Sequence, residues 1–258
     1  MKTSGGSETA KRRAGVSAAA QVDDGDVVGL GTGSTAAHAI RQLGERVDGG
    51  LDVRGVATSF ASRELADEVG VPLVDLDQVV GPGRPGIDVA IDGADQFVTV
   101  EDPENNAWER AVTSVLIKGG GAAHAREKVV DATADRLLVV ADPSKSATVL
   151  DRDVPIEVLP SARTAVAAAV RAAGGEPTLR RAARKDGPVV TDNGNLVIDG
   201  AFGEIIDPTA LATALASTPG IVEHGLFVGI ADEIHIGTDD GVRTVACDGR
   251  NRERETEQ

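Results

Sequence analysis

Short apolar runs alternate with helix-like segments from about residue 10 to residue 142, and this alternation limits the possible folds more than any other feature of the chain. Residues 26–33 (DVVGLGTG) have the length and composition of a buried strand. Residues 34–47 (STAAHAIRQLGERV) carry apolar side chains at a helical spacing. Because alternating elements of this length build βαβ units, we predict an α/β fold with a doubly wound, mostly parallel, Rossmann-like sheet.

The core has to be built almost without aromatic side chains. Aromatic residues make up 2% of the chain and hydrophobic residues 41%, so Val, Ile, Leu and Ala must fill the interior. Such side chains suit a parallel sheet that is covered by helices. The composition therefore predicts the same class of fold as the alternation does.

Several further segments fit the alternating pattern. We expect strands at residues 52–58, 71–76, 86–95, 114–118 and 135–142, and helices from residue 10, at 34–47, at 59–70 and from about residue 122. Ser34 and Thr35 are the expected N-cap residues of the second helix.

The pattern changes after Asp153. We expect strands at residues 154–160 and 220–230, helices at 161–175 and 207–218, and hairpins at 188–200, turned at Asn193 and Gly194, and at 232–246. Antiparallel pairing of this kind predicts a second, smaller α+β domain at residues 154–230. The first domain would span residues 1–153 and be completed by residues 231–250, and residues 4–7 and 251–258 are expected to be disordered tails.

The chain is strongly acidic. Its 41 Asp and Glu against 26 Lys and Arg give a net charge of −15, which would repel nucleic acid and anionic membranes, so we expect neither as a partner. Only six of the cations are lysines, a composition typical of proteins that work at high salt, where screening weakens self-repulsion. An ordinary acidic soluble protein is the alternative.

Nothing in the sequence indicates export. The single cysteine, Cys247, excludes an intrachain disulfide, and no apolar run approaches membrane-spanning length. The first 25 residues lack the apolar core of a signal peptide. We therefore expect a cytoplasmic protein.

Glycines and hydroxyl residues follow the first predicted strand, at the end where ligands bind in an open α/β sheet. Residues 29–36 (GLGTGSTA) fit the dinucleotide-binding pattern, but Ala57, Thr58 and Ser59 stand where its ribose-binding acid is expected. This argues against an NAD-dependent dehydrogenase. A glycine turn that leads into a helix among the hydroxyls of residues 32–35 favours binding of a simple phosphate. A purely structural turn is the alternative.

Two acids, Asp92 and Asp95, end another apolar strand, and Gly93 and Ala94 between them leave room for a ligand. Carboxylates this close can divide the acid and base work of a reaction. A solvated turn is the alternative. We predict no metal, because none of the four histidines has ligand spacing with these acids.

Residues 116–130 (LIKGGGAAHAREKVV) combine a lysine, three glycines and a glutamate. Three consecutive glycines are costly unless something must approach the backbone closely. In the helix that follows, Ala123 and Val130 share the side of Glu127, so this carboxylate should be partly buried and able to act as a base near neutral pH. Lys118 and the glycine N–H groups would stabilise an oxyanion beside it. A flexible joint with a solvated glutamate is the alternative.

The placement of lysines supports an anion site. Lys118 and Lys145 are two of only six lysines, and both follow predicted strand ends. In so acidic a chain this placement indicates a local requirement for positive charge.

Six motifs, taken together and in order, resemble the type A ribose-5-phosphate isomerases. They are residues 29–40 (GLGTGSTAAHAI), 92–95 (DGAD), 117–128 (IKGGGAAHAREK), 139–145 (VVADPSK), 155–160 (PIEVLP) and 191–199 (TDNGNLVID). The resemblance extends from about residue 11 to residue 246. It implies an enzyme of the non-oxidative pentose phosphate pathway that interconverts D-ribose 5-phosphate and D-ribulose 5-phosphate without a metal or organic cofactor. It also implies a homodimer or homotetramer.

The resemblance assigns roles to individual residues. Glu127 matches the catalytic base, which moves a proton between the first two sugar carbons through a cis-enediolate. Asp92 and Asp95 match the acids that handle the sugar hydroxyls and ring opening, and Lys118 matches the group that stabilises the enediolate. The matching substrate-binding positions are Thr32, Gly33, Ser34, Thr35, Gly93, Ala94, Gly119, Gly120, Gly121, Lys145 and Lys11.

The chain departs from the family pattern in two places. Gln96 stands where the family commonly has an acid, and the connector at residues 96–115, which contains Trp108, is longer than usual. Neither departure removes a residue with a chemical role. We expect the connector to affect a lid or a contact between subunits.

Two other classes of function compete with that of an isomerase. A sugar-phosphate-sensing module of a transcription regulator would need a DNA-binding helix pair and a basic face, and the residues before the first helix are too few for one. An acyl-CoA transferase-like relative stays open at this point, because a fold alone does not determine function.

Overall fold

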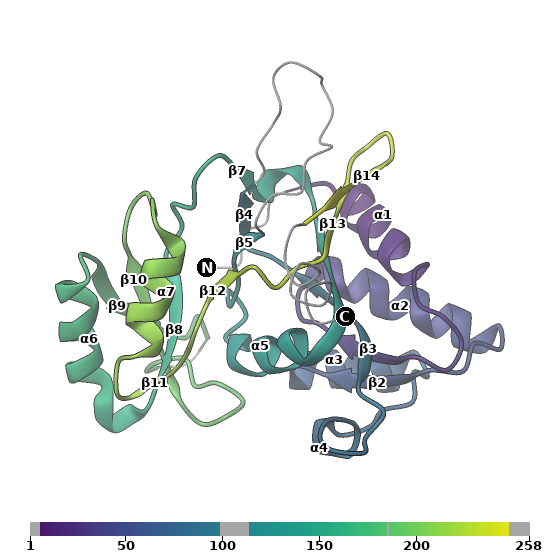
Figure 1. Ribbon diagram of the computed structural model, residues 1–258, viewed down its shortest axis with the longest axis horizontal. Helices are drawn as coiled ribbons and strands as arrows, with labels where there is room; N and C mark the ends of the chain where they lie inside the picture. The colour runs from purple at the N-terminus through teal and green to yellow at the C-terminus, as the bar shows by residue number, and fades with distance from the viewer. Residues whose placement is uncertain (1–5, 99–113, 185, 248–258) are drawn as a thin grey trace, which may run out of the picture.

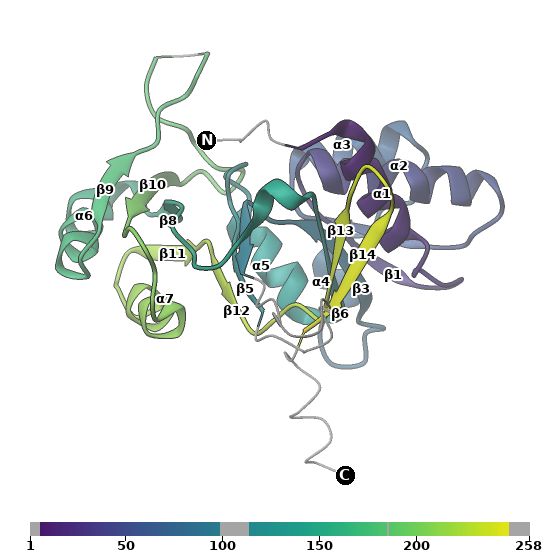
Figure 2. The same ribbon diagram turned by 90° about the horizontal axis from the view of Figure 1, so that it is seen from above.

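The computed structural model describes residues 6–98, 114–184 and 186–247, which form three β-sheets with helices packed around them (Figure 1). Figure 2 shows one sheet with its two helices at one end of the molecule and the largest sheet at the other end. The small remaining sheet lies between them.

The largest sheet has six strands in the order β14-β13-β6-β3-β1-β2, and all neighbours are parallel except β13 and β14. Its strands are β1 (Val27–Leu30), β2 (Arg54–Ala57), β3 (Ile87–Gly93), β6 (Ala134–Ala141), β13 (Glu233–Gly237) and β14 (Val242–Ala246). The predicted α/β fold with a doubly wound, mostly parallel sheet is therefore confirmed. The hairpin expected at residues 232–246 is also present, and β13 adds to this sheet beside β6.

Both faces of the six-stranded sheet are covered. The helices around it are α1 (Glu8–Ala19), α2 (Ser34–Asp48), α3 (Phe60–Glu68), α4 (Leu76–Val79) and α5 (His124–Thr133). Successive strand residues point to opposite faces, so Leu138 and Val140 pack with α1 and α2, whereas Leu137 and Val139 pack in the core that contains Val130 of α5. Aliphatic side chains fill both cores, as the composition predicts.

The small middle sheet corrects one prediction. Its order is β12-β5-β4-β7, with strands β4 (Gln96–Val98), β5 (Val115–Ile117), β7 (Ser146–Ala147) and β12 (Leu226–Val228). The run at residues 114–118 was expected in the parallel sheet, but β5 pairs antiparallel with β4 and β12. The chain leaves the large sheet after β3, where the Asp95 N–H donates to the Ile117 carbonyl at 2.8 Å.

The third sheet is antiparallel, with the order β11-β8-β10-β9, and α6 and α7 pack against this part of the chain. Its elements are β8 (Val154–Val158), α6 (Arg163–Ala172), β9 (Glu176–Leu179), β10 (Leu196–Ala201), α7 (Pro208–Ala216) and β11 (Ile221–His224). This is the smaller α+β unit that the sequence indicates. The exact boundaries after residues 153 and 230 stay a prediction.

The predicted strand at residues 220–230 is wrong in its length, because it divides into β11 and β12 in different sheets. The division occurs at Gly225, where a Cβ atom would lie 2.2 Å from the Lys118 carbonyl oxygen. Only glycine permits this approach, and it brings the third sheet next to the lysine that begins the glycine run.

Three further expectations are wrong in detail. Residues 71–76 form no strand but a single bridge between Gly55 and Leu73, since Pro72 has no N–H to donate. The first arm of the hairpin at 188–200 contributes only isolated bridges. Gly33, rather than Ser34 or Thr35, is the N-cap residue of α2.

Ser7 was predicted to lie in a disordered tail at residues 4–7, and the structure corrects this for Ser7. The Ser7 hydroxyl accepts a hydrogen bond from the Ala10 N–H and so caps α1. The predicted tail at residues 251–258 and the central part of the 96–115 connector, with Trp108, lie outside the described residues.

Candidate active site

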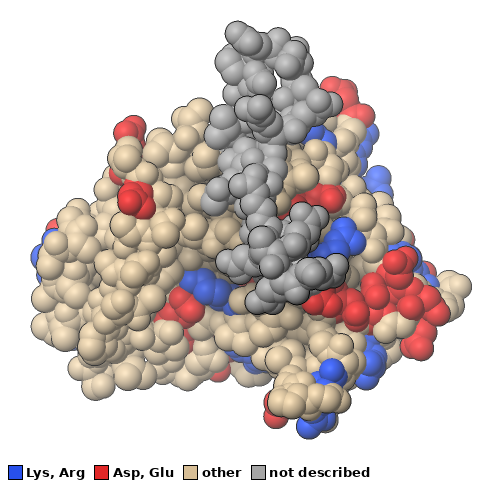
Figure 3. All heavy atoms as spheres, viewed as in Figure 1, with Lys and Arg blue, Asp and Glu red and all other residues tan. Residues whose placement is uncertain are grey.

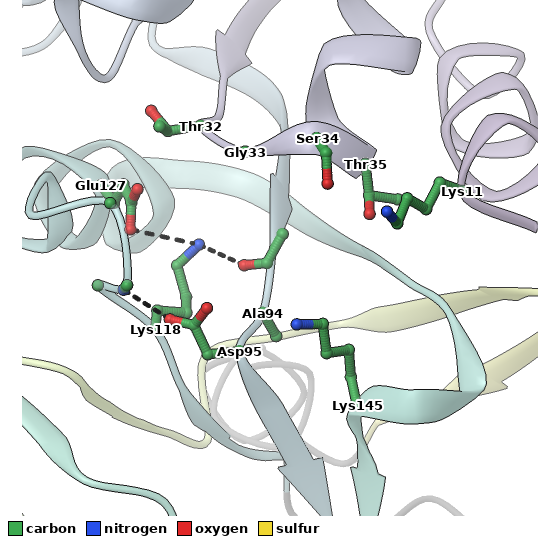
Figure 4. Close-up of a pocket in the computed structure, with 14 residues that line it drawn as sticks. Lys11, Thr32, Gly33, Ser34, Thr35, Ala94, Asp95, Lys118, Glu127 and Lys145 are labelled. Atoms are coloured by element: carbon green, nitrogen blue, oxygen red, sulfur yellow. Dashed lines mark hydrogen bonds and ion pairs between the residues drawn. The ribbon is translucent and has the colours of Figure 1, made fainter. Parts of the chain in front are cut away.

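The carboxyl-terminal ends of β1, β3 and β5 meet around a cavity of about 280 Å³ (Figure 4). Its lining consists of Lys11, Thr32, Gly33, Ser34, Thr35, Gly93, Ala94, Asp95, Lys118, Gly119, Gly120, Gly121, Glu127 and Lys145. All of these residues were expected from the sequence. Asp92 is the one expected residue that does not line the cavity.

A buried charge cluster forms one side of the cavity. The Lys118 ammonium lies 2.8 Å from an Asp92 carboxylate oxygen and 3.6 Å from one oxygen each of Glu127 and Asp131. It also donates to the Gly93 carbonyl at 2.6 Å. All four charged residues are at most 3% exposed, so their charges interact with little screening by water.

The pKa values in this cluster are shifted by its surroundings. Burial raises the pKa of Glu127 well above its ordinary value of 4.5, because the buried carboxylate loses hydration. Lys118 opposes this rise in the Glu127 pKa, while Asp92, Asp131 and then Asp95 add to it. Burial by itself lowers the pKa of Lys118, but its three carboxylate neighbours outweigh burial and the pKa is raised. Glu127 therefore binds a proton more readily than an exposed glutamate does.

Asp92 supports the site from behind the cavity wall. Its carboxylate accepts hydrogen bonds from the N–H of Thr32 at 3.0 Å and of Gly93 at 2.6 Å, in addition to pairing with Lys118. A Cβ on Gly31 would lie 2.3 Å from this carboxylate, so the first glycine of the loop after β1 is needed to admit Asp92. Asp92 thus connects Thr32, which follows β1, with Lys118, which follows β5.

The glycine run is shaped by its neighbours rather than by flexibility. Gly119 has a φ of 102°, a conformation that side chains disfavour. A Cβ on Gly120 would lie 2.7 Å from Asp95, and the Gly120 N–H donates to Asp95 at 2.6 Å. The interpretation of the run as a mere joint is therefore wrong, because its backbone packs against an acid that lines the cavity.

The opposite side of the cavity is suited to an anion. Figure 4 shows Ser34, Thr35, Lys11 and Lys145 there, across from Glu127 and Lys118. The backbone at Gly33 takes a φ of 120° and leads into the 15-residue helix α2, whose N-terminus carries partial positive charge. Burial lowers the pKa of Lys145.

Thr32 contributes differently from what its hydroxyl suggests. The sequence predicts three hydroxyl side chains around the phosphate, those of Thr32, Ser34 and Thr35. The Thr32 hydroxyl, however, donates to Ser59 at 2.7 Å and lies 3.0 Å from the Thr58 hydroxyl. Its side chain is thus engaged with the residues that end β2. Ser34 and Thr35 are the hydroxyl residues that face the anion side.

Two parts of the site were missed at the level of sequence. Asp131 lies four residues after Glu127 on α5, and this i, i+4 spacing, which puts both acids on one side of the helix, would have indicated it. In the sequence, Thr58 and Ser59 indicate only that no ribose-binding acid stands at these positions. In the structure, their hydroxyls lie within hydrogen-bond distance of the Thr32 hydroxyl and hold its side chain. No local pattern reveals that second role.

Within the described residues, no group of three or more His, Cys, Asp or Glu side chains is arranged to hold a metal ion. None of their helices is long and apolar enough to cross a membrane.

Comparison with known proteins identifies the family. The family model described as ribose 5-phosphate isomerase A (phosphoriboisomerase A) matches residues 54–241. The chain belongs to the ribose 5-phosphate isomerase A family.

Relatives and solved structures of this family match nearly the whole chain. The ribose-5-phosphate isomerase A of Halorubrum lacusprofundi is 72% identical over 94% of this chain and 98% of its own length. That of Haloarcula marismortui is 62% identical over 92% and 96%, respectively. The structure of ribose 5-phosphate isomerase A from Methanocaldococcus jannaschii is similar with a TM-score of 0.81 at 40% identity, covering 92% of this chain and 97% of that chain. The regulatory and transferase alternatives are not favoured by these matches.

Proposed function

We propose that the chain interconverts D-ribose 5-phosphate and D-ribulose 5-phosphate, as its family membership indicates, with Glu127 as the base. The observation that carries the assignment is a carboxylate that lines the cavity, is 3% exposed and has a raised pKa, 3.6 Å from a buried ammonium. A raised pKa makes the ionised carboxylate a stronger base than an exposed glutamate, which suits it to take a proton from carbon.

The reaction moves one proton between two carbons. In the open-chain aldose, Glu127 would take the proton from C2, and the electron pair would form the C1=C2 bond of a cis-enediolate while negative charge develops on oxygen. Returning this proton to C1, together with transfer of the O2 hydroxyl proton to O1, gives the ketose and restores the carboxylate. Atoms and electrons balance in these steps without a metal or organic cofactor.

Lys118 and the glycine backbone would stabilise the enediolate. The Lys118 ammonium lies next to the base and is kept charged by Asp92. Preorganised donors of this kind act on charge that appears only in the transition state, where they contribute most to rate. Asp92 acts in this proposal through Lys118 rather than by contact with the sugar.

Asp95 is the acid that we assign to the sugar hydroxyls and ring opening. It lines the cavity and is anchored by the Gly120 N–H, which leaves its other carboxylate oxygen for the substrate. Gly93 and Ala94, which also line the cavity, leave space beside it.

The phosphate would bind at the far side of the cavity, against Gly33, Ser34 and Thr35, with Lys11 and Lys145 supplying charge. A solved structure of D-ribose-5-phosphate isomerase that is 39% identical to this chain, with a TM-score of 0.82, is in complex with phospho-erythronic acid. Phospho-erythronic acid combines a phosphate with a carboxylate, and the proposed site has one end suited to each group.

The proposal is tested by following conversion of ribose 5-phosphate to ribulose 5-phosphate in molar KCl, with and without EDTA. We expect turnover that survives chelation. Absence of turnover would refute the isomerase assignment, and complete loss with EDTA would refute the metal-independent mechanism while leaving the reaction in place.

We also infer that the protein works in a salty cytoplasm as a homodimer or homotetramer. Its net charge is −15, and Figure 3 shows acidic side chains gathered over one end of the face in view. The oligomer is what the resemblance to the family implies, and Ile206, which is 81% exposed, is an apolar side chain that a contact between subunits could cover. Light scattering in molar KCl should give at least twice the 26.4 kDa chain mass, and a monomer there would contradict the oligomer.

A further inference from the structure

A guanidinium from the third sheet reaches the back of the glycine run. Arg180 follows β9, and its Nη1 donates to the carbonyl oxygens of Gly119 at 2.9 Å and Gly120 at 3.3 Å. Arg180 is not among the residues that line the cavity. The contact therefore holds the wall of the cavity from outside.

Asp199 fixes the orientation of this guanidinium. Arg180 donates from Nε to one Asp199 carboxylate oxygen at 2.9 Å and from Nη2 to the other. Asp199 lies in β10, which pairs with β9 through Asp199 and Thr178, and Arg180 directly follows β9. Their side chains are only 11% and 16% exposed. A bidentate pair of this kind holds the plane of the guanidinium and leaves Nη1 directed at the glycines.

Because Arg180 binds the carbonyl oxygens of the glycine peptides, it also determines the direction in which their N–H groups point. In a trans peptide the C=O and the following N–H point in opposite directions, and the described residues contain no cis peptide. The Gly119 carbonyl faces Arg180, and the Gly120 N–H of the same peptide faces Asp95. The Gly120 carbonyl also faces Arg180, so the N–H of Gly121 points away from Arg180, and Gly121 itself lines the cavity.

We propose that Arg180, held by Asp199, is a positioning residue that aims the Gly121 N–H at the oxygen on which the enediolate charge develops. No described residue accepts a hydrogen bond from this N–H, so it is available to a ligand. Glycine peptides rotate easily, and these have no side chains to hold them. The inference rests on the proposed function of the cavity, and it gives the smaller α+β unit a part in the reaction.

The expected effect follows from the loss of one aimed donor. Removing a donor of an oxyanion site lowers kcat by about 10²- to 10³-fold, and a donor that is present but free to rotate should cost less. We therefore expect Arg180→Met to lower kcat by roughly 10- to 100-fold. KM should change less than about threefold, because the donor acts on charge that the bound aldose does not yet carry.

Two further variants make the test specific. Arg180→Lys keeps the charge but has a single ammonium that cannot serve Asp199 and both carbonyls, so its kcat should fall between those of Arg180→Met and wild type. Arg171→Met is the matched control, because Arg171 is an arginine of the same unit that pairs with Glu176 at 3.3 Å and is 56% exposed. We expect wild-type kcat and KM from this control.

The experiment measures kcat, KM and the melting temperature of all four proteins. A wild-type kcat in folded Arg180→Met, or a lowered melting temperature with kcat unchanged, would overturn the positioning role. If Arg180→Met does not fold, Arg180→Lys decides, and a kcat equal to that of wild type would likewise overturn the proposal. A wild-type chain without isomerase activity would instead refute the proposed function itself.

Discussion

The two ends of the cavity use positive charge in different ways. At the reaction end, Lys118 is 2% exposed and surrounded by three carboxylates, so its position and its charge are both fixed. At the anion end, positive charge comes from a helix N-terminus and from Lys11 and Lys145, which are 8% and 9% exposed at the cavity wall. The difference indicates that one end is built for charge that appears during reaction, and the other for charge that the substrate always carries.

The largest effect is expected from Lys118→Met. This change leaves three buried carboxylates without their cation, and removing one partner of a buried ion pair typically costs about 3–5 kcal/mol. We expect the free energy of unfolding to fall by that amount and kcat to fall below detection. Chemical denaturation and the isomerase assay measure the two effects.

Lys128→Met is the control for this comparison. Lys128 is also a largely buried lysine, paired with Glu223 at 2.7 Å, but it does not line the cavity. The Lys128→Met change should lower the free energy of unfolding while leaving kcat within about fivefold of wild type. Equal kcat losses in both variants would show that burial of a lysine, rather than its place in the cavity, matters.

A smaller and different effect is expected at the anion end. Lys145→Gln should raise KM by about 10- to 100-fold, because a hydrogen bond to a charged group contributes roughly 1.5–3 kcal/mol, while kcat should change little. Arg12→Gln removes an exposed charge from α1 and serves as the control. A Lys145→Gln variant with a lower kcat and an unchanged KM would contradict the proposal that the anion end of the cavity contributes to binding and the reaction end to turnover.

The smallest effect is a pH dependence of stability. Because the pKa of Glu127 is raised in the folded protein, the folded state binds a proton that the unfolded state has released above pH 4.5. The free energy of unfolding should therefore decrease as pH rises from 4.5 through the raised pKa, and Glu127→Gln should remove this decrease. Urea denaturation across this range measures it, and identical slopes in both proteins would contradict the raised pKa.

The sequence predicts the features of the site that depend on local periodicity, but not those that depend on contacts between distant segments. Local patterns located the strand ends, the glycine run and the buried side of α5, because strand and helix periods decide which side chains share a face. They could not show that Asp92 lies behind Lys118, that Thr32 turns its hydroxyl to Ser59, or that β5 leaves the parallel sheet. These features depend on contacts between segments far apart in the chain, which leave no periodic signal.

The hydrogen bond from Arg180 to the Gly119 carbonyl is the clearest example of a contact between distant segments. Arg180 and Gly119 are 61 residues apart and meet only because Gly225 lets the third sheet pack against the Lys118 backbone. Motifs and strand ends indicated the residues of the cavity lining and Asp92 behind it, but no local pattern indicated Arg180, Thr58 or Ser59.

The most direct test of the central claim is the turnover of Glu127→Gln, which keeps the size of the side chain but cannot accept the proton. A positioned base contributes about 10²- to 10⁴-fold, so we predict a loss of kcat of at least that order with little change in binding of ribose 5-phosphate. Glu45→Gln, an exposed glutamate on α2, should behave as wild type. A Glu127→Gln enzyme with wild-type kcat would contradict the assignment of this carboxylate as the base.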